Sequence, residues 1–596
     1  MVLQQYDWLF IIGFFIISIL IGVITSKTAS KSFKDFFLSG RNMPWWLLGI
    51  SMVATTFSAD TPNLVTDIVR QNGISGNWVW WAFLLTGMLT VFVYAKLWRR
   101  SEVLTDLEFY ELRYSGKEAA FLRGFRAIYL GVFFNVMIMA TVSLAAIKIG
   151  GVMLGISPIQ TIFWASLVTV IYSSLGGLKG VMITDFFQFI IAMIGAVWAA
   201  YIAVNLPQVG GLSKLLVHEN VIGKLNFLPD FSNWETLVPL LILPLAVQWW
   251  SVWYPGAEPG GGGYIAQRML SAKNEKSAVA ATFMFNVMHY ALRPWPWILV
   301  GLASLIVFPD IASLQAAFPD IDPGVVKNDL AYPAMLTFLP AGLLGLVIAS
   351  LIAAYMSTIS THLNWGASYV VNDFYKRFLK PDASEKELVM VGRISTVILM
   401  VLAGFLALML SNALQAFNIL LQIGAGTGLL FILRWFWWRV NAWSEIAAMV
   451  VSFLMALYLE LIHVKLGFEA IDTHWKLLIG VGVTSLAWIL VAFVTPPASM
   501  EVMKNFVKMI NPGGPGWRHV EKEMGRSDEE INSAIKKWDV PRGILAMMLG
   551  VILVYSALFA TGFWIYGNTI PALVLSVVVV IVSIILGRMV KKISFQ

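Results

Sequence analysis

The residues best suited to chemistry form a short run of hydroxyl side chains inside an apolar stretch. Ser357, Thr358, Ser360 and Thr361 occupy four of five consecutive positions. On a helix, positions i, i+3 and i+4 share one face, so Ser357, Ser360 and Thr361 would point the same way. Neutral oxygens suit a hard cation such as sodium, by analogy with other hard cations. The alternative is that each hydroxyl bonds back to the carbonyl of residue i−4.

Two apolar segments contain residues that interrupt a regular helix. The segment Met52–Pro62 carries hydroxyls, a carboxylate and a proline, and Trp253–Gly263 carries prolines and a run of glycines. Unpaired backbone groups are costly in lipid, so an interrupted helix is tolerated only where it is buried in protein or lines a wet cavity. The freed carbonyls of the first interruption would face the hydroxyl run and favour an ion site.

Ionisable side chains at membrane depth are functional candidates by default. Asp60 would contact a solute or form a structural ion pair with Arg293 or His289. Glu258 would act in a gate or cap the following helix. Arg293 would bind a carboxylate through two hydrogen bonds, and His289 would be a protonation site or a hydrogen-bonded structural histidine. A further polar helix face, at spacings of three and four residues, consists of Gln415, Asn418 and Gln422.

The composition identifies the class of protein that must position these residues. The 596 residues are 58% hydrophobic and 13% charged, against about 25% charged residues in soluble domains. The absence of cysteine excludes a disulfide scaffold. The net charge of +7 is better explained by basic cytoplasmic loops than by nucleic-acid binding. No metalloprotease, phosphate-loop or Ser/His/Asp pattern indicates an enzyme or a cofactor other than a coupling ion.

Fifteen apolar segments predict an all-α polytopic protein in the lipid bilayer. They cover residues 6–25, 44–69, 76–98, 122–154, 158–176, 180–204, 234–254, 277–308, 341–374, 388–410, 412–433, 442–463, 474–494, 541–566 and 569–588. Loops after odd-numbered segments are basic and the others are neutral or acidic, so we expect the N-terminus outside and the C-terminus in the cytoplasm. The first segment is followed by Lys27 and not by a cleavage site, which predicts an uncleaved helix.

The positions of the two interruptions predict the domain organisation. Each interrupted segment would begin a unit of five spans, and an odd number of spans inverts the second unit relative to the first. Paired interruptions of this kind indicate a transporter site near the middle of the membrane. The predicted parts are an N-terminal helix and loop, two inverted five-helix repeats, and C-terminal helices with a cytoplasmic loop at 496–540. These parts cover residues 1–43, 44–204, 234–433 and 434–596.

Four short motifs in this order resemble the sodium/solute symporter family, which includes bacterial sodium/proline and sodium/galactose symporters and animal sodium/glucose cotransporters. They are Ser39–Arg41, Gly176–Gln188, Tyr264–Lys273 and Met356–Lys376. The resemblance covers about residues 1–433. It implies a LeuT-type core of five plus five inverted helices, one extra N-terminal helix and about four C-terminal helices.

The resemblance also implies sodium ligands. The core sodium site would use the backbone carbonyls of Ala54, Phe57 and Ala354 and the hydroxyls of Ser357 and Thr358. Some members have a second sodium site built on a carboxylate, and Asp185 matches that residue. Its partners here would be Ser357, Ser360 and Thr361, so two sodium ions per cycle is a hypothesis.

Solute contacts follow partly from the same resemblance. Sugar-transporting members match at Thr56, Thr61, Ser251, His289 and Asn418, and Tyr254 matches the aromatic residue that closes the site from inside. With the ionisable and polar candidates, the full predicted set is Thr56, Asp60, Thr61, Ser251, Tyr254, Glu258, His289, Arg293, Asn418 and Gln422. This sequence departs from the family in the segment 255–263 and in having His289 and Arg293 one turn apart.

The resulting hypothesis is a cell-membrane symporter that imports a small organic solute with sodium by alternating access. A sugar or polyol is the first choice, because the matched contacts are neutral hydrogen-bonding groups. A carboxylate or amino acid is the second choice because of Arg293. A proton-coupled carrier using Asp60 or His289, and a solute sensor on a transporter fold, are the remaining alternatives. We expect a monomer to be sufficient for transport.

Overall fold

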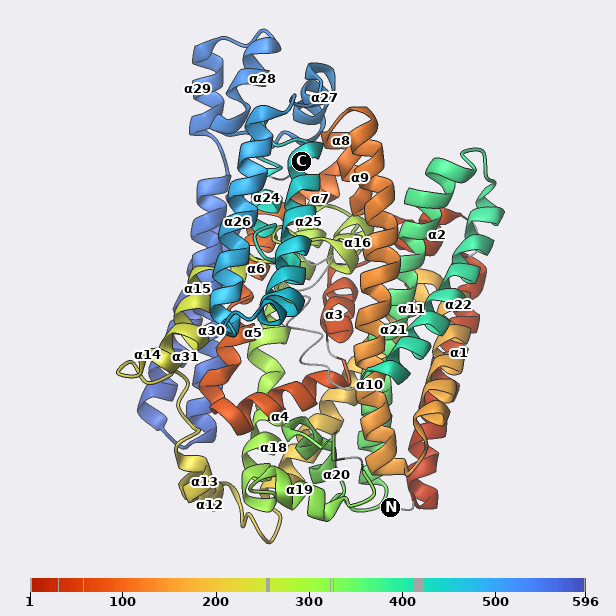
Figure 1. The fold of residues 1–596 in the computed structure, drawn as a ribbon, viewed down its shortest axis with the longest axis vertical. Helices are drawn as coiled ribbons and strands as arrows, with labels where there is room; N and C mark the ends of the chain where they lie inside the picture. Colours follow the sequence, from red (N-terminus) through yellow and green to blue (C-terminus); the bar gives the residue numbers. More distant parts are fainter. Residues whose placement is uncertain are drawn as a thin grey trace.

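The computed structural model describes residues 3–29, 32–56, 58–252, 258–321, 323–324, 326–410, 423–593 and 595. Within these ranges the chain is all-helical, which confirms the predicted fold class, and the extended pairing is limited to one bridge between Met43 and Ala272. The helices form an elongated bundle. Its N-terminus and C-terminus lie towards opposite ends of the long axis (Figure 1).

The N-terminal helix lies along one edge of the bundle (Figure 1). This part consists of α1 (Gln5–Ala29), α2 (Phe33–Leu38) and the short turn η1 (Ser39–Arg41). The carboxylate of Asp7 anchors the start of α1, because its Oδ1 accepts hydrogen bonds of 2.7 Å from the backbone N–H groups of both Gly342 and Gly345. The helix α2 carries the basic residue Lys34 and leads through η1 to the first interrupted segment.

The first predicted repeat begins with an interrupted helix, as expected. Its elements are α3 (Trp45–Thr56), α4 (Asp60–Asn72), η2 (Ile74–Asn77), α5 (Trp78–Trp81), α6 (Leu84–Leu89), η3 (Thr90–Tyr94), α7 (Ala95–Ser101), η4 (Asp106–Glu108), α8 (Phe109–Arg113), α9 (Gly116–Ile128), η5 (Tyr129–Phe134), α10 (Asn135–Leu154) and α11 (Pro158–Val204). The expected spans 158–176 and 180–204 are both part of α11. A non-helical residue, Gly177 (φ 55°, ψ −163°), separates them, and glycine adopts this positive φ without strain.

The second predicted repeat follows a short outer segment with α12 (Leu212–Val217) and α13 (Glu219–Ile222). Its elements are α14 (Trp234–Leu237), η6 (Val238–Ile242), α15 (Leu243–Ala246), η7 (Gln248–Trp250), α16 (Gly263–Ser271), α17 (Glu275–Val287), η8 (Met288–Leu292), α18 (Pro294–Val307), α19 (Ile311–Ala317), η9 (Asn328–Leu330), α20 (Ala331–Leu336), α21 (Leu343–Ser368), η10 (Tyr369–Leu379), α22 (Glu385–Met409) and α24 (Gly428–Leu433). Residues 258–262 are not helical, so the second predicted interruption is also observed.

The C-terminal part adds a peripheral group of helices. It consists of α25 (Ala442–Leu457), η11 (Tyr458–Ile462), η12 (Val464–Leu466), α26 (Thr473–Val494), α27 (Met500–Ile510), η13 (Pro515–Trp517), α28 (Arg518–Glu523), α29 (Asp528–Lys536), α30 (Val540–Ile565) and α31 (Thr569–Val590). The segment 496–540, expected to be a linker, is folded into α27–α29 at the C-terminal end of the bundle (Figure 1). Trp517 anchors it, because this fully buried side chain donates to the carbonyl of Trp435 at 2.9 Å.

Eleven helices of the described residues are long and apolar enough to cross a membrane. Three shorter apolar helices add to them, namely Trp45–Thr56, Pro158–Ile171 and Trp234–Ala246. These three belong to the interrupted segments and to the first arm of α11, where a break shortens each helix. The total of fifteen spans and the inverted-repeat arrangement stay predictions.

Candidate functional site

The interruption between α3 and α4 lies in the middle of the bundle. The helix α3 ends at Thr56 and α4 begins at Asp60. Helix C-termini leave carbonyl groups without intrahelical partners. Two of these carbonyls accept from the guanidinium of Arg293, which lies 3.2 Å from the oxygen of Val53 and 3.3 Å from that of Thr56. A cation at this end also balances the negative pole of the helix.

The hydroxyl run on α21 meets the same helix end. The Thr358 hydroxyl donates to the carbonyl of Thr55 at 2.8 Å, and the Ser357 hydroxyl donates to Oδ1 of Asp185 at 2.7 Å. Ala54 and Ala354, whose carbonyls are predicted ligands, are both 1% exposed. Phe57 lies outside the described residues. Neutral oxygens next to one carboxylate suit a hard cation such as sodium, by analogy with other hard cations, and the five sodium ligands stay predictions.

Asp185 and Arg268 form a buried ionic centre beside this hydroxyl run. Oδ2 of Asp185 accepts from the Ser51 hydroxyl at 2.5 Å and lies 3.8 Å from the guanidinium of Arg268. Both charged side chains are fully buried. A buried charge is tolerated when it is paired and its remaining hydrogen bonds are made. The carboxylate therefore already has a positive partner within the protein.

The guanidinium of Arg268 also reaches the predicted second-site residues. It donates to the hydroxyl of Thr361 at 2.7 Å, and Thr361 is within 2.9 Å of the Thr55 hydroxyl. The Ser360 hydroxyl donates instead to the carbonyl of Ser357 at 3.1 Å. The sequence analysis assigned no role to Arg268 or Ser51. Arg268 falls between the predicted spans 234–254 and 277–308, so no signal placed it at membrane depth, and nothing distinguishes Ser51 from other helical serines.

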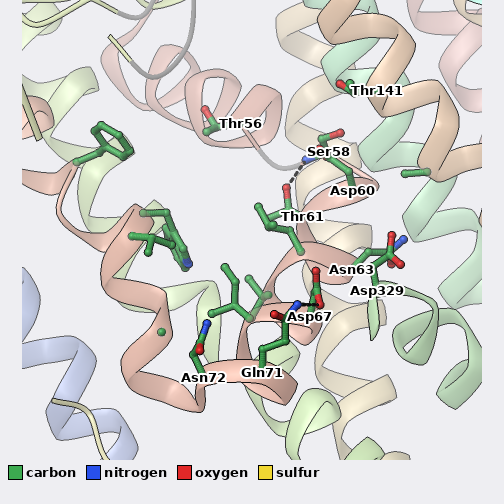
Figure 2. A pocket seen from close by; sticks show the side chains of 18 of the residues that line it. Thr56, Ser58, Asp60, Thr61, Asn63, Asp67, Gln71, Asn72, Thr141 and Asp329 are labelled. Atoms are coloured by element: carbon green, nitrogen blue, oxygen red, sulfur yellow. Dashed lines mark hydrogen bonds between the residues drawn. The ribbon is translucent and has the colours of Figure 1, made fainter. Parts of the chain in front are cut away.

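A cavity of about 770 Å³ begins at the α3–α4 interruption. It runs along α4 towards the end of the molecule that carries α19, α20 and the N-terminus (Figures 1 and 2). Thr55, Thr56 and Thr358 line its deep end, and Lys327 and Asp329 line its mouth. Figure 2 shows Ser58, Asp60, Thr61 and Asn63 along one wall, with Asp67, Gln71 and Asn72 further along the same helix.

The cavity brings together half of the predicted solute contacts. Those that line it are Thr56, Asp60, Thr61, His289 and Arg293. Ser251 and Glu258 are buried but do not line it, and the Ser251 hydroxyl points back to the carbonyl of Val247 at 3.3 Å. Tyr254, Asn418 and Gln422 lie outside the described residues. As predictions of solute contact, all ten stay untested.

Several polar atoms along this cavity have no hydrogen-bond partner within the described part of the chain. They are Ser58 Oγ, Asp60 Oδ1, Asn63 Oδ1, His289 Nδ1 and Asp329 Oδ1. Buried polar groups in proteins are nearly always paired with protein, water or ligand. These atoms therefore mark the positions where a bound polar molecule or its water would be held. Asp60 and Arg293, considered as an ion pair from sequence, make no direct ion pair, because Arg293 contacts the carbonyls of α3.

An aromatic wall faces these polar groups. Trp80, which the sequence analysis did not single out, lines the cavity and stacks on Tyr290 with ring centroids 5.8 Å apart and an interplanar angle of 22°. The rings of His289 and Trp80 are nearly perpendicular, and their centroids lie 5.7 Å apart. Flat aromatic faces opposite hydroxyl and carboxylate oxygens suit a compact molecule with both apolar and polar faces.

The opposite side of the interruption is closed by buried ion pairs. Glu258, which follows the second interruption, pairs with Arg126 at 2.6 Å. Arg126 lies 4.0 Å from Glu445, which in turn lies 3.6 Å from Arg434 and accepts from the Tyr114 hydroxyl at 2.6 Å. The side chains of the four charged residues are at most 5% exposed.

A second buried contact joins the same two halves of the chain. Asp106 accepts from the backbone N–H of Gly263, at the start of α16, at 2.8 Å and from the Tyr369 hydroxyl at 2.5 Å. We call the residues Asp106, Tyr114, Arg126, Glu258, Gly263, Tyr369, Arg434 and Glu445 the paired layer. Three of the helices that carry or adjoin it, α9, α24 and α25, lie between the interruption and the C-terminal end (Figure 1).

Comparison with known proteins agrees with this geometry. A model described as "Sodium:solute symporter family" matches residues 36–452. The chain is 28% identical to the sodium/glucose cotransporter of Vibrio parahaemolyticus over 74% of this chain and 82% of that protein. It is 26% identical to human sodium/myo-inositol cotransporter 2, over 78% and 71% of the two chains. It is also 26% identical to the sodium/sialic acid symporter of Proteus mirabilis, over 76% and 90%.

The fold is similar to that of a solved transporter. The substrate-bound outward-open structure of a Na⁺-coupled sialic acid symporter superposes with a TM-score of 0.66 at 22% identity, covering 83% of this chain and 99% of that one. The resemblance predicted from the four motifs is confirmed by the family match.

Proposed function

Because the chain belongs to the sodium:solute symporter family, we propose that it is a cell-membrane transporter that couples inward sodium flow to the uptake of one small neutral polyhydroxylated solute. The single observation that carries the proposal is the meeting of the α21 hydroxyls with the interrupted helix at the deep end of the cavity. The Thr358 hydroxyl is bonded to the Thr55 carbonyl, and both residues also line the cavity. Thr358, a predicted sodium ligand, is therefore also part of the wall of the proposed solute site.

Because Thr358 would belong to both sites, sodium binding and solute binding can be coupled physically. A sodium ion at Ser357, Thr358 and the end carbonyls of α3 would fix the interruption and with it the adjacent cavity wall formed by Asp60 and Thr61. The ion then favours the conformation that binds solute, and the differential affinity between the two conformations is the coupling free energy. An inward sodium ion adds about 2.3 kcal/mol per 100 mV of membrane potential.

The contacts that Arg293 already makes within the protein support a neutral solute. Its guanidinium donates to the carbonyls of Val53 and Thr56 and stacks over Trp297 with 5.2 Å from its central carbon to the ring centre. A substrate carboxylate would have to displace these contacts. The unpartnered oxygens of Asp60 and Asn63 would instead accept from hydroxyl groups, and Trp80 would contact the apolar face of a ring. Relatives named for glucose and myo-inositol support this choice.

A second sodium ion at Asp185 belongs to the same proposal. Ser357 contacts the carboxylate, and Thr361 is joined to the carboxylate through Arg268. In this arrangement the guanidinium provides the positive charge that a second ion would otherwise supply, so the two would compete. A stoichiometry of one sodium per solute at equilibrium, unaltered by Asp185→Asn, would contradict a second ion.

A proton-coupled carrier is the second candidate. It is favoured by two partnerless groups that can titrate, Asp60 Oδ1 and His289 Nδ1, in the wall of the cavity. Uptake that is independent of sodium and collapses with a protonophore would support it.

The first experiment is a stability screen on the purified protein. We expect sodium chloride, but not potassium chloride at equal ionic strength, to raise the melting temperature. A matching sugar or polyol should raise it further only when sodium is present. The panel would hold glucose, galactose, myo-inositol, sialic acid and proline. Stabilisation by proline or sialic acid alone would overturn the neutral-solute part of the proposal, and equal stabilisation by potassium would overturn the sodium part.

A further inference from the structure

A second hollow, which shares no lining residue with the cavity at the α3–α4 interruption, lies on the flank of the bundle. It has a volume of about 920 Å³ and lies where core elements η3 and α17 meet the peripheral helices α30 and α31. Its lining is apolar except for one serine and two lysines. The lining residues are Phe92, Lys276, Val279, Ala280, Phe283, Leu553, Ser583, Leu586, Gly587, Val590, Lys591, Ile593 and Phe595. We call this hollow the flank groove.

The flank groove opens onto the surface that faces lipid. The helix α31 is one of the apolar helices able to cross a membrane, and only 17% of its apolar window is buried. Ser583 and Gly587 lie on its exposed part. A Cβ atom added at Gly587 would have no heavy atom within 4 Å, so the groove is empty of protein at this point. The small residues Ala280 and Gly587 thus leave space on a surface that lipid acyl chains would surround.

The mouth of the flank groove is positively charged. Lys276 and Lys591 are both exposed, and the Lys276 ammonium lies 5.8 Å from the centre of the Phe595 ring. Neither lysine forms an ion pair with any residue of the described chain. Lys591 follows the end of α31, and the contact with Phe595 places Lys276 near the C-terminal end of the chain.

The acidic residues closest to the mouth along the chain are already neutralised. Glu275 pairs with Arg100 at 2.9 Å, and Asp539 pairs with Lys96 at 3.1 Å. The positive charge of Lys276 and Lys591 is therefore not balanced by these protein carboxylates. An apolar hollow with two uncompensated lysines at the membrane boundary is complementary to a molecule with an anionic head and apolar tails.

We propose that the flank groove binds one anionic diacyl phospholipid, with its phosphate between Lys276 and Lys591 and its acyl chains along α17 and α31. In the orientation predicted from loop charges, the head group would lie at the cytoplasmic face. The bound lipid would fill the space between the transporter core and the C-terminal helix pair. This proposal does not depend on which solute or ion the protein carries.

The test is native mass spectrometry of the purified full chain, titrated with phosphatidylglycerol or with phosphatidylethanolamine of identical acyl chains. We expect phosphatidylglycerol to bind at least tenfold more tightly. The double variant Lys276→Gln/Lys591→Gln should lose this preference and bind the two lipids alike. Equal binding of the two lipids by the wild-type chain, or an unchanged preference in the double variant, would overturn the proposal.

A second pair of variants tests the apolar part. Gly587→Leu should fill the hollow and reduce phosphatidylglycerol binding at least tenfold. Gly482→Leu, on α26, is the matched control, because a Cβ there also meets nothing within 4 Å, and it should bind like the wild type. Glycerol phosphate added alone tests the head group as a free ligand. Competition by it at the lipid's own concentration, or full lipid binding by Gly587→Leu with an unchanged melting temperature, would overturn the assignment to a lipid.

Discussion

The two sides of the α3–α4 interruption differ in how they treat polar groups. Towards the N-terminal end, the cavity wall presents partnerless oxygens and nitrogens, among them Asp60 Oδ1 and Asn63 Oδ1. Towards the C-terminal end, the paired layer joins acids directly to bases, as in the Arg126–Glu258 pair at 2.6 Å. Some of its atoms also have no hydrogen-bond partner within the described residues, namely Arg126 Nε, Glu258 Oε2, Arg434 Nε and Glu445 Oε2. The two sides therefore differ in whether an opposite charge of the protein lies in direct contact.

This difference identifies the conformation. Unpaired buried groups are costly, so the polar wall is stable only when it is wet or occupied. A closed layer of buried ion pairs, in contrast, holds helices together only while both partners remain in place. We infer from the cavity and the paired layer a state that is open towards the N-terminal end. In the opposite state, the ion pairs of the paired layer would have to separate and become hydrated.

The largest effect is expected at the point where the two sides meet. The double variant Ser357→Ala/Thr358→Ala removes both predicted side-chain sodium ligands. We expect the apparent sodium affinity in uptake to fall about 100-fold or more, since hydrogen bonds to charged groups contribute about 1.5–3 kcal/mol each. Ser368→Ala is the control on the same helix, because that buried hydroxyl bonds to the carbonyl of Trp365. Unchanged sodium dependence in the double variant would show that the core site is elsewhere.

The next effect concerns the paired layer. Arg126→Gln leaves Glu258 and Glu445 without their shared cation, which costs about 3–5 kcal/mol in a buried site, so the population should move towards the inward-open state. The chain has no cysteine, and Thr61→Cys therefore supplies a single label site in the cavity. We expect a membrane-impermeant thiol reagent to modify it at least about tenfold more slowly in the Arg126→Gln background.

The matched control for this experiment is Arg377→Gln. Arg377 is 44% exposed and pairs with Glu111 at 2.8 Å, and surface ion pairs contribute about 0–1 kcal/mol. The labelling rate of Thr61→Cys should then stay within about twofold. The same rate in the Arg126→Gln and Arg377→Gln backgrounds would mean that the paired layer is not a gate.

A smaller effect is expected from the wall of the cavity. Asp60→Asn removes the charge from an oxygen that has no protein partner, and the KM for solute should rise about tenfold with little change in sodium affinity, since a charge-assisted hydrogen bond is about twice as strong as a neutral one. Asp67→Asn is the control, because its carboxylate accepts from Gln71 at 2.6 Å. Equal KM values for the two variants in sodium-driven uptake would contradict a solute contact at Asp60.

The smallest effect on stability is expected at the mouth of the cavity. Lys148 pairs with Asp329 at 2.7 Å, and both residues line the cavity. Asp329 is 20% exposed and can gain water when its partner is removed, so Lys148→Gln should lower the free energy of unfolding by about 1.5–3 kcal/mol, less than Arg126→Gln. Thermal unfolding measures this change. A loss of unfolding free energy as large as that of Arg126→Gln would mean that the mouth of the cavity is no more hydrated than the paired layer.

The sequence predicted the parts of this arrangement that depend on local rules. Pro62 lies in the first turn of α4, where proline is tolerated, and Gly260 has a positive φ of 90° in a non-helical segment. The hydroxyls of Ser357 and Thr358 share a turn by helix geometry alone. Contacts between segments that are far apart in the sequence could not be predicted in this way. The pairing of Glu258 with Arg126 and of Asp185 with Arg268 joins residues over 80 positions apart, and charge identity does not specify which partner is nearest. Trp80 was missed because many tryptophans in a membrane protein face lipid.

The most direct test of the central claim is solute uptake by the purified chain in proteoliposomes. An inward sodium gradient should drive accumulation of the sugar or polyol found in the stability screen. Replacing sodium by potassium should abolish this accumulation, and an inside-negative potential should increase it. Uptake of the same size without sodium, lost on addition of a protonophore, would contradict sodium-coupled transport.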